Sequence, residues 1–427
     1  MTGFPKFLDG ARKDLLIIYL FASACAVYLV LLSGVCYTPD LNSYVVAWNH
    51  SYSSWHIDRF RTPVYPIFIG LVQEVVGPHY LWVVIGIQYL IFFVSIPFFH
   101  RLLTEVTASK SISFWLTLFY SSFPGMAILN NYVQTESITI SLSVFMAWAF
   151  LSLINGKSRW PVLPFVVFLA LLVFSRPAQL YFMPVLVAVF IAMCLFKRVR
   201  RAGIRGLSGT LFVCLLFALW VNAFHKNYGV TTPSGISVVN QYHIGRTFGL
   251  INKDNLENQK MAPYLVQEKG PDFLGFDIPL YDETFQLIDD FGLKSVNDEV
   301  KASIKRDPGG WTWALWRRFR RSGYDRLFSF GPFNSIREMM GVRMSSVYVF
   351  AMVILAFLCF SIHKTKHVPW FSVTLFLLVA GNLATSVLGA QTEWGRLALP
   401  STPFMFILLG EMLAKLTFEE EFQNDSI

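Results

Sequence analysis

Six charged side chains in this 427-residue chain lie beside long apolar stretches and are of types that can do chemistry. Charge in or next to a membrane-spanning segment is costly, and by default it marks a functional site. All six fall at the end of an apolar stretch or in a short connection, and they come from four separate parts of the chain. We therefore expect a cluster at one face of a membrane rather than a proton path through its middle. The residues are Asp40, Asp58, Glu136, Arg176, Glu393 and Arg396.

The first polar loop holds several further candidate groups. Asp40 and Tyr44 are four residues apart, so on a helix they share one face. The carboxylate can cap the start of that helix or act as a functional acid. Arg59 and Arg61 follow, shortly before Tyr65. Two arginines suit a phosphate because their planar guanidinium groups donate in pairs and stay charged, although ordinary lipid headgroups would use the same contacts.

The later candidates lie at the starts of apolar stretches or between them. Glu136 begins one stretch, where the first turn of a helix favours an acid for structural reasons alone. Arg176 stands with Pro177 between two stretches, and function is favoured there because an unpaired arginine is hard to explain as packing. Glu393 and Arg396 are three apart and can pair on a helix. A structural ion pair and a ligand contact both fit them.

Ten apolar segments have to position these groups. Hydrophobic residues make up 54% of the chain and charged residues 15%, whereas a soluble domain carries about 25% charge. A soluble enzyme is therefore excluded, and the excess apolar surface must face lipid. A spanning helix needs roughly 20 apolar residues. The expected spans of this all-α polytopic membrane protein are about 15–37, 80–99, 111–127, 136–154, 161–175, 178–196, 207–225, 346–363, 370–389 and 399–416.

Basic residues set the expected orientation, because short cytoplasmic loops collect Lys and Arg. With the N-terminus in the cytoplasm, the cytoplasmic segments hold fifteen basic residues and the short outer segments hold four. We expect a multi-pass integral membrane protein with both termini cytoplasmic, and a bacterial inner or plasma membrane is the first choice. The net charge of +8 belongs to these loops, so nucleic acid is not an expected partner.

Two segments do not fit the spanning pattern. Residues 63–77 are apolar but too short to cross, and they predict a helix in the outer interface. Residues 226–345 hold 16 basic and 14 acidic residues, which predicts a water-exposed, mostly α outer segment. Within it, 311–324 mixes aromatic and basic residues, and an interfacial anchor is favoured over a clamp for a substrate phosphate. The expected parts are a membrane core at 1–225 with a first outer loop at 38–79, the outer segment at 226–345, and C-terminal spans with a cytoplasmic tail at 346–427.

In order and topology these motifs resemble the GT-C glycosyltransferases that use lipid-phosphate sugar donors, whose relatives include the protein O-mannosyltransferases and the lipid A aminoarabinose transferases. The likeness covers residues 1–225 and 346–416, and the segment 226–345 has no match. The matching features are Asp40 with Tyr44 after the first span, the run Arg61-Thr-Pro-Val-Tyr-Pro66, Thr135-Glu136 at a span start, Arg176-Pro177 between spans, and Glu393 to Arg396 before the last span.

The resemblance implies transfer of a sugar from a polyprenyl-phosphate donor to a lipid, glycan or protein acceptor on the outer face. Asp40 would be the general base of a single displacement that inverts the anomeric centre. The departing phosphate would be bound by Arg176 and Arg396, with Arg61 and Arg59 next. The groups expected to orient these side chains or to bind substrate are Tyr44, Glu136, Glu393, Asp58 and Tyr65.

One departure from the family pattern concerns metal. Many members carry paired acids in the first loop, whereas Asp40 is followed by Leu41 and no such pair occurs there. A divalent metal is therefore possible but not favoured, and no cofactor is expected.

Two other classes of function stay open. A transporter or flippase of a lipid-linked or anionic solute would also explain many spans and outer arginines. It predicts charges or broken helices near the middle of the membrane, usually in paired halves. The sequence shows neither a repeat nor such pairing, and Glu411 in the last span is the only deep acid. An assembly subunit without chemistry would tolerate replacement of the outer charges.

Overall fold

The computed structural model describes residues 4–37, 39–156, 162–251, 278–324, 343–389 and 397–424. Within these ranges the regular secondary structure is helical, and each of the ten expected apolar segments contains a helix. The helices are α1 (Phe4–Ser33), α2 (Pro39–His50), η1 (Tyr52–Ser54), α3 (Val64–Val76), η2 (Gly77–His79), α4 (Tyr80–Thr107), α5 (Lys110–Ser122), α6 (Pro124–Ala127), η3 (Ile128–Asn131), α7 (Thr135–Asn155), α8 (Val162–Ser175), η4 (Pro177–Tyr181), α9 (Phe182–Cys194), α10 (Arg200–Tyr228), α11 (Ile236–Thr247), α13 (Ile278–Phe291), α14 (Leu293–Arg306), α15 (Pro308–Ser322), α17 (Met344–Thr365), α18 (Trp370–Gly389), η6 (Leu399–Ser401) and α20 (Thr402–Asn424).

The apolar helices have the length and composition of membrane spans. In the described part of the chain eight helical runs qualify, and α5 with α6 and η3 makes a ninth if that bent pair is one span. The pair bends by 51° after α5 ends at Ser122, where Pro124 begins the next helix. The remaining expected span, α8, is apolar but has only 14 residues. The chain is therefore an all-α, multi-pass membrane protein.

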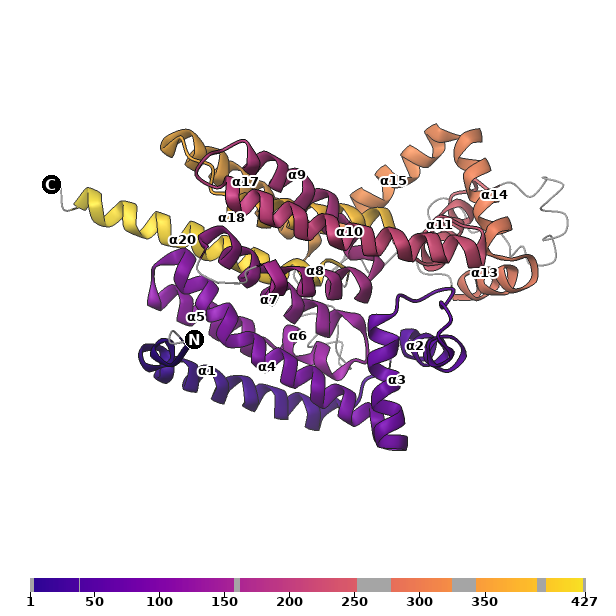
Figure 1. Cartoon of the computed structure of the whole chain (residues 1–427), viewed down its shortest axis with the longest axis horizontal. Helices are drawn as coiled ribbons and strands as arrows, with labels where there is room; N and C mark the ends of the chain where they lie inside the picture. Colours follow the sequence, from indigo (N-terminus) through magenta and orange to yellow (C-terminus); the bar gives the residue numbers. More distant parts are fainter. Residues whose placement is uncertain are drawn as a thin grey trace.

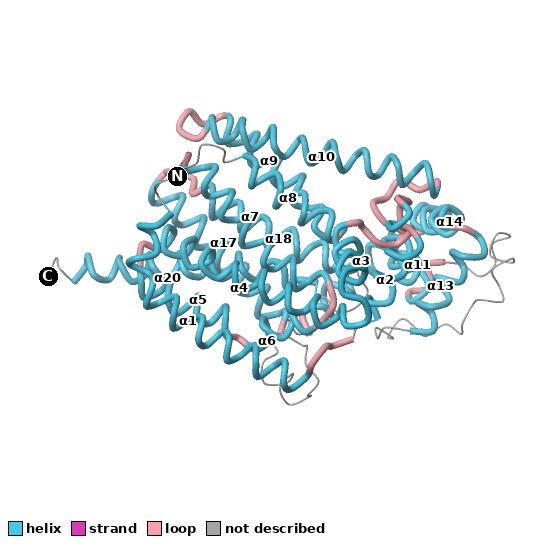
Figure 2. The backbone as a smooth tube through the Cα atoms, turned by 60° about the horizontal axis from the view of Figure 1, so that its bottom comes forward, coloured by secondary structure: helices cyan, strands magenta, loops and turns pink. Residues whose placement is uncertain are grey.

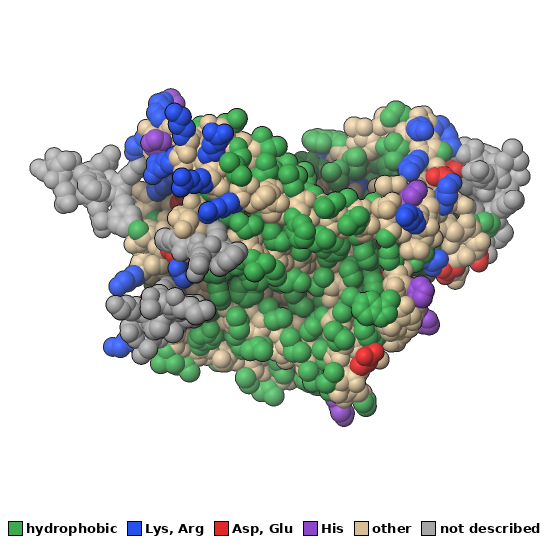
Figure 3. Space-filling model, viewed as in Figure 1, with side chains coloured by type: hydrophobic (Ala, Val, Ile, Leu, Met, Phe, Trp, Pro, Cys, Tyr) green, Lys and Arg blue, Asp and Glu red, His purple; other side chains and the backbone are tan. Residues whose placement is uncertain are grey.

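The two ends of the bundle differ in what they carry. Figure 1 shows that α1 begins and α20 ends at the same end, whereas α2, α3, α11, α13 and α14 gather at the opposite end, and Figure 2 shows the same arrangement from another side. On the face seen in Figure 3, hydrophobic side chains form a broad band in the middle, and Lys and Arg collect towards both ends. Such a band is what lipid contact requires. We call the end with α2 and α11 the outer end, following the expected orientation.

The helix α3 shapes the outer end of the bundle. It belongs to an apolar run of 44 residues, Val64–Thr107. A straight helix of that length would measure about 66 Å, roughly twice the 30 Å hydrocarbon core, so the run cannot be a single span. Gly77 interrupts it with a φ of 72°, and Figure 1 shows α3 lying across the end of α4. This arrangement agrees with the interfacial helix predicted for 63–77.

The outer segment has an apolar core of its own. Buried side chains from the end of α10 and from α11, α13 and α14 form this core, and Ile57 and Phe60 of the first loop pack against it. Three hydrogen bonds fasten the same loop: Tyr228 Oη donates to Ile57 O at 2.5 Å, Gly235 N donates to Arg59 O at 2.8 Å, and Ser234 Oγ donates to Phe60 O. These hydrogen bonds therefore attach the backbone just before Arg61 to the outer segment.

Candidate functional site

The first turn of α2 carries the candidate base. Pro39 begins the helix, which suits its fixed φ and missing N–H, and Asp40 follows in the first turn, where the helix dipole favours an acid. Arg61 Nη2 lies 2.6 Å from Asp40 Oδ1, and the two side chains are 17% and 22% exposed, respectively. The carboxylate is thus paired and still reaches solvent.

The loop that presents Arg61 is shaped by Asp58. Asp58 Oδ1 accepts hydrogen bonds from Phe60 N at 2.8 Å and from Arg61 N at 2.7 Å. Its other oxygen accepts from Ser51 Oγ at 3.3 Å. The Tyr52 hydroxyl donates to Arg61 O, and burial, together with the charge of Asp58, raises the pKa of Tyr52. Asp58 therefore stabilises the backbone turn that leads to Arg61. The predicted contact between Asp58 and a substrate remains a prediction.

Two tyrosines form the floor beneath the Asp40–Arg61 pair. The Arg61 guanidinium lies 4.6 Å from the centre of the Tyr44 ring, and Tyr44 meets Tyr65 edge to face at 4.8 Å. Tyr44 is 4% exposed and Tyr65 is fully buried. Tyr65 Oη donates to Gln88 Oε1 at 2.6 Å, so the floor is fixed to α4 through a polar contact.

A second ion pair lies where α7 begins and α8 ends. Arg176 Nη2 is 3.4 Å from Glu136 Oε1, and both side chains are buried, at 7% and 2% exposure, respectively. Thr135 Oγ1 donates to the other carboxylate oxygen at 3.2 Å. Arg176 has extended backbone between α8 and η4, which Pro177 begins. Both residues thus stand at helix ends, as the sequence predicts.

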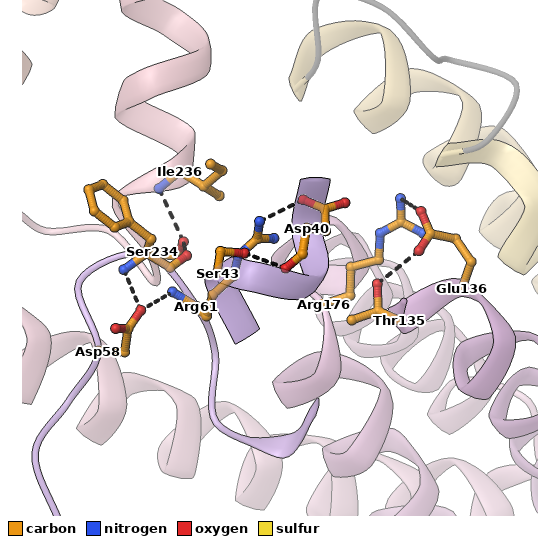
Figure 4. Close-up of polar contacts among 10 residues, drawn as sticks. Asp40, Ser43, Asp58, Arg61, Thr135, Glu136, Arg176, Ser234 and Ile236 are labelled. Atoms are coloured by element: carbon orange, nitrogen blue, oxygen red, sulfur yellow. Dashed lines mark hydrogen bonds and ion pairs between the residues drawn. The ribbon is translucent and has the colours of Figure 1, made fainter. Parts of the chain in front are cut away.

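The two ion pairs are neighbours. The buried phenol of Tyr65 interacts electrostatically with Asp40 and with Glu136. Figure 4 shows the Asp40–Arg61 and Glu136–Arg176 pairs together, at the starts of α2 and α7. The arrangement combines a solvent-reachable carboxylate, which can accept a proton, with guanidinium groups, which can bind an anion.

Of the predicted site residues that the structure describes, Arg59 stands apart from this pairing. Arg59 pairs with Asp289 of α13 on the surface of the outer segment and covers the Phe60 ring at 4.6 Å. Glu393 and Arg396 lie outside the described residues.

Sequence reasoning missed three buried polar residues beside the second pair. Gln134 precedes Glu136 by two residues, and Gln179 N donates to Arg176 O at 2.9 Å. The side-chain amides of both glutamines and the hydroxyl of Tyr181 are buried and make no hydrogen bond in the described part of the chain. The available signal was their position directly next to the charged motifs, at the edges of apolar stretches.

Among the described residues, no group of three or more His, Cys, Asp or Glu side chains is arranged to hold a metal ion.

Comparison with known proteins identifies the fold. No family model and no curated protein sequence matches the chain. Among solved structures it is similar to the oligosaccharyltransferase of Archaeoglobus fulgidus, a GT-C protein whose structure contains a tethered acceptor peptide with the NVT sequon. Sequence identity is 13% and the TM-score is 0.50. The match covers 95% of this chain and 50% of the archaeal one, so the chain spans about half the length of that protein. The likeness shows that the chain has a GT-C fold.

Proposed function

We propose that this protein is a membrane glycosyltransferase that moves a sugar from a polyprenyl-phosphate donor to an acceptor at the outer end of the bundle. One observation carries the proposal: in a GT-C fold, a carboxylate that reaches solvent, Asp40, is paired with Arg61, and the Glu136–Arg176 pair at the helix ends lies near it (Figure 4). The lipid tail of such a donor stays in the membrane, so its phosphate lies at the interface, where these helix ends lie.

The reaction is a single displacement. The acceptor hydroxyl oxygen attacks the anomeric carbon, and its proton goes to Asp40. The bond between the anomeric carbon and the phosphate oxygen breaks, and its electron pair leaves with the polyprenyl phosphate. Because only one displacement occurs, the configuration at the anomeric carbon is inverted.

Arg176 and Arg61 are the cations for the departing phosphate. Nη1 of Arg176 is buried and donates no hydrogen bond within the described residues, so it keeps a donor for an anion. Arg61 already lies against Asp40; a shift of its guanidinium towards the phosphate would release the carboxylate to take the proton. Arg396 and Glu393 remain predicted partners of the donor, and no metal takes part in the step.

The acceptor is less narrowly defined than the donor. The tethered peptide of the archaeal oligosaccharyltransferase makes a peptide one acceptor class, beside lipids and glycans. The outer segment touches the first loop through Tyr228, Ser234 and Gly235, which supports a role for this segment in presenting the acceptor.

A transporter or flippase is the second candidate, because the α5–α6 break of 51° is the kind of interrupted helix that transporters use. The helix η3, which follows the break, is hydrogen-bonded to α1: Asn131 Nδ2 donates to Leu29 O at 3.1 Å and to Ser33 Oγ at 2.8 Å. These bonds give Asn131 a structural role in η3.

The test is a transfer assay in proteoliposomes. Purified protein is mixed with polyprenyl-phosphate hexose and pentose donors carrying a radiolabelled sugar, and with peptide, glycan or lipid acceptors. We expect the label to move to one acceptor class, with polyprenyl phosphate as the second product. Movement of intact donor between leaflets, without cleavage of the glycosyl bond, would favour the flippase.

A further inference from the structure

One face of α15 is buried over three turns. Trp311, Ala314, Arg318 and Ser322 follow each other at helical spacing, and their exposed fractions are 7%, 0%, 0% and 0%, respectively. Arg318 is the largest of the fully buried side chains in the described part of the protein. An arginine is an unusual residue at the centre of such a face.

The guanidinium of Arg318 has no counter-ion within the described residues. Its Nε, Nη1 and Nη2 atoms are all buried, and none of them donates a hydrogen bond. Burial lowers the pKa of Arg318 to about 10, so the group is still charged at neutral pH. A buried charge is normally paired, because an unpaired one loses its hydration without compensation. Arg318 therefore calls for an anion.

The opposite face of the helix indicates which anions are available to bind Arg318. Trp313, Trp316 and Phe319 are about half exposed, and Arg317 covers the Trp313 ring at 4.7 Å. Exposed aromatic and basic side chains on one helix are typical of the lipid headgroup layer. Phosphate groups are the abundant anions at that depth, and the planar guanidinium group suits them.

The helix α15 connects the outer segment to the membrane helices. Its last turn is fixed to α17, because Ser322 Oγ and Tyr348 Oη are 2.5 Å apart and Phe319 stacks on Tyr348 at 5.3 Å. Figure 1 shows α15 running between α14 and the membrane helices. Arg318 thus lies where the outer segment meets the bundle.

We propose that Arg318 binds the phosphate group of a lipid that enters beneath α15 from the headgroup layer. The lipid is a membrane phospholipid or a polyprenyl phosphate, which share this chemistry. The site is separate from the roles proposed for Asp40 and Arg176, and it does not depend on sugar transfer.

The experiment measures thermal unfolding of the full chain in a neutral detergent. Each phosphate lipid is compared with its phosphate-free counterpart: phosphatidylglycerol with diacylglycerol, and a polyprenyl monophosphate with its polyprenol. Inorganic phosphate is a further arm. Arg318→Met removes the charge, Arg318→Lys keeps it without the planar fork, and Arg320→Met is the matched control because Arg320 is exposed on the same helix.

We expect a phosphate lipid to raise Tm in wild type and in Arg320→Met, while its counterpart does not. The affinity should fall roughly tenfold or more in Arg318→Met and less in Arg318→Lys. A response to phosphatidylglycerol alone assigns a membrane-lipid site, and a response to polyprenyl phosphate alone assigns a site for the carrier lipid.

Three results would overturn the proposal. One is equal Tm with phosphate lipids and their counterparts in wild type, or a shift with inorganic phosphate only. Another is unchanged lipid affinity in both Arg318 variants. The third is an Arg318→Met protein that is more stable than wild type at every lipid concentration, as expected when a buried charge without an anion is removed. If Arg318→Met does not fold, wild type and Arg318→Lys decide the outcome.

Discussion

The guanidinium group of Arg61 forms an ion pair with Asp40 and a cation–π contact with the Tyr44 ring. This group is 2.6 Å from the carboxylate and 4.6 Å from the centre of the ring. Both members of the pair keep some exposure, 17% for Arg61 and 22% for Asp40. The buried Glu136–Arg176 pair beside it is different, because neither partner can turn to water. The site therefore combines one partly exposed ion pair with one buried ion pair.

The proposed role of Asp40 predicts a catalytic defect without a folding defect. Asp40→Asn keeps the shape of the side chain and removes the base, so kcat for sugar transfer should fall by roughly 10² to 10⁴. The pair is partly exposed, so Tm should change little. The control is Asn42→Ala, at an exposed position of α2, which should transfer normally. Wild-type turnover by folded Asp40→Asn would show that another group is the base.

The buried pair predicts strong coupling between Glu136 and Arg176. Each single change, Glu136→Gln or Arg176→Met, leaves one uncompensated buried charge or unpaired group and should destabilise the protein by about 3–5 kcal/mol. The double variant should lose clearly less than the sum, as measured by unfolding in detergent. Donor affinity should fall in both variants that lack Arg176. Additive losses of stability, or unchanged donor affinity without Arg176, would contradict the interpretation.

The contact between α2 and α3 predicts a steric effect at Gly70. A Cβ atom at Gly70 would lie 1.9 Å from the Trp48 ring. Gly70→Ala should therefore displace α2, lower stability by about 1–3 kcal/mol, and reduce transfer because Asp40 moves with the helix. Gly86→Ala is the matched control, since a Cβ atom there meets nothing within 4 Å. Similar effects of the two changes on Tm and on transfer would count against this account.

The reaction is expected to proceed without a divalent metal. Asp40 accepts the proton and the arginines balance the phosphate, so turnover in excess EDTA should equal that in buffer. The measurement is the initial transfer rate after dialysis against EDTA. An EDTA-sensitive rate that Mg²⁺ or Mn²⁺ restores would refute the metal-free mechanism.

The membrane architecture follows from sequence because it depends on local patterns. The apolar stretches predict the helices. Pro177 predicts the break at Arg176, and the short apolar run at 63–77 predicts the interfacial helix α3. The partners of the charged groups depend on contacts between distant residues. Nothing near Arg61 or Arg59 in sequence shows that one turns to Asp40 and the other to Asp289.

Arg318 shows the same limit inside a single helix. Four arginines within 317–321 look alike as a basic run, and the sequence predicts an interfacial helix. Their spacing from the buried Trp311 separates Arg318 from the others, but only the packing of α15 against neighbouring helices shows that its charge is buried without a partner in the described chain.

The central claim is that a lipid-linked phosphate binds beside Asp40 at the outer end of the bundle. The most direct test is a structure of the protein in lipid nanodiscs with a non-hydrolysable polyprenyl-phosphate sugar bound. The account predicts that the phosphate contacts Arg176, with Arg61 turned towards it, and that the anomeric carbon faces Asp40. A phosphate bound near the middle of the membrane, or a donor whose sugar points away from Asp40, would contradict it and favour the transporter.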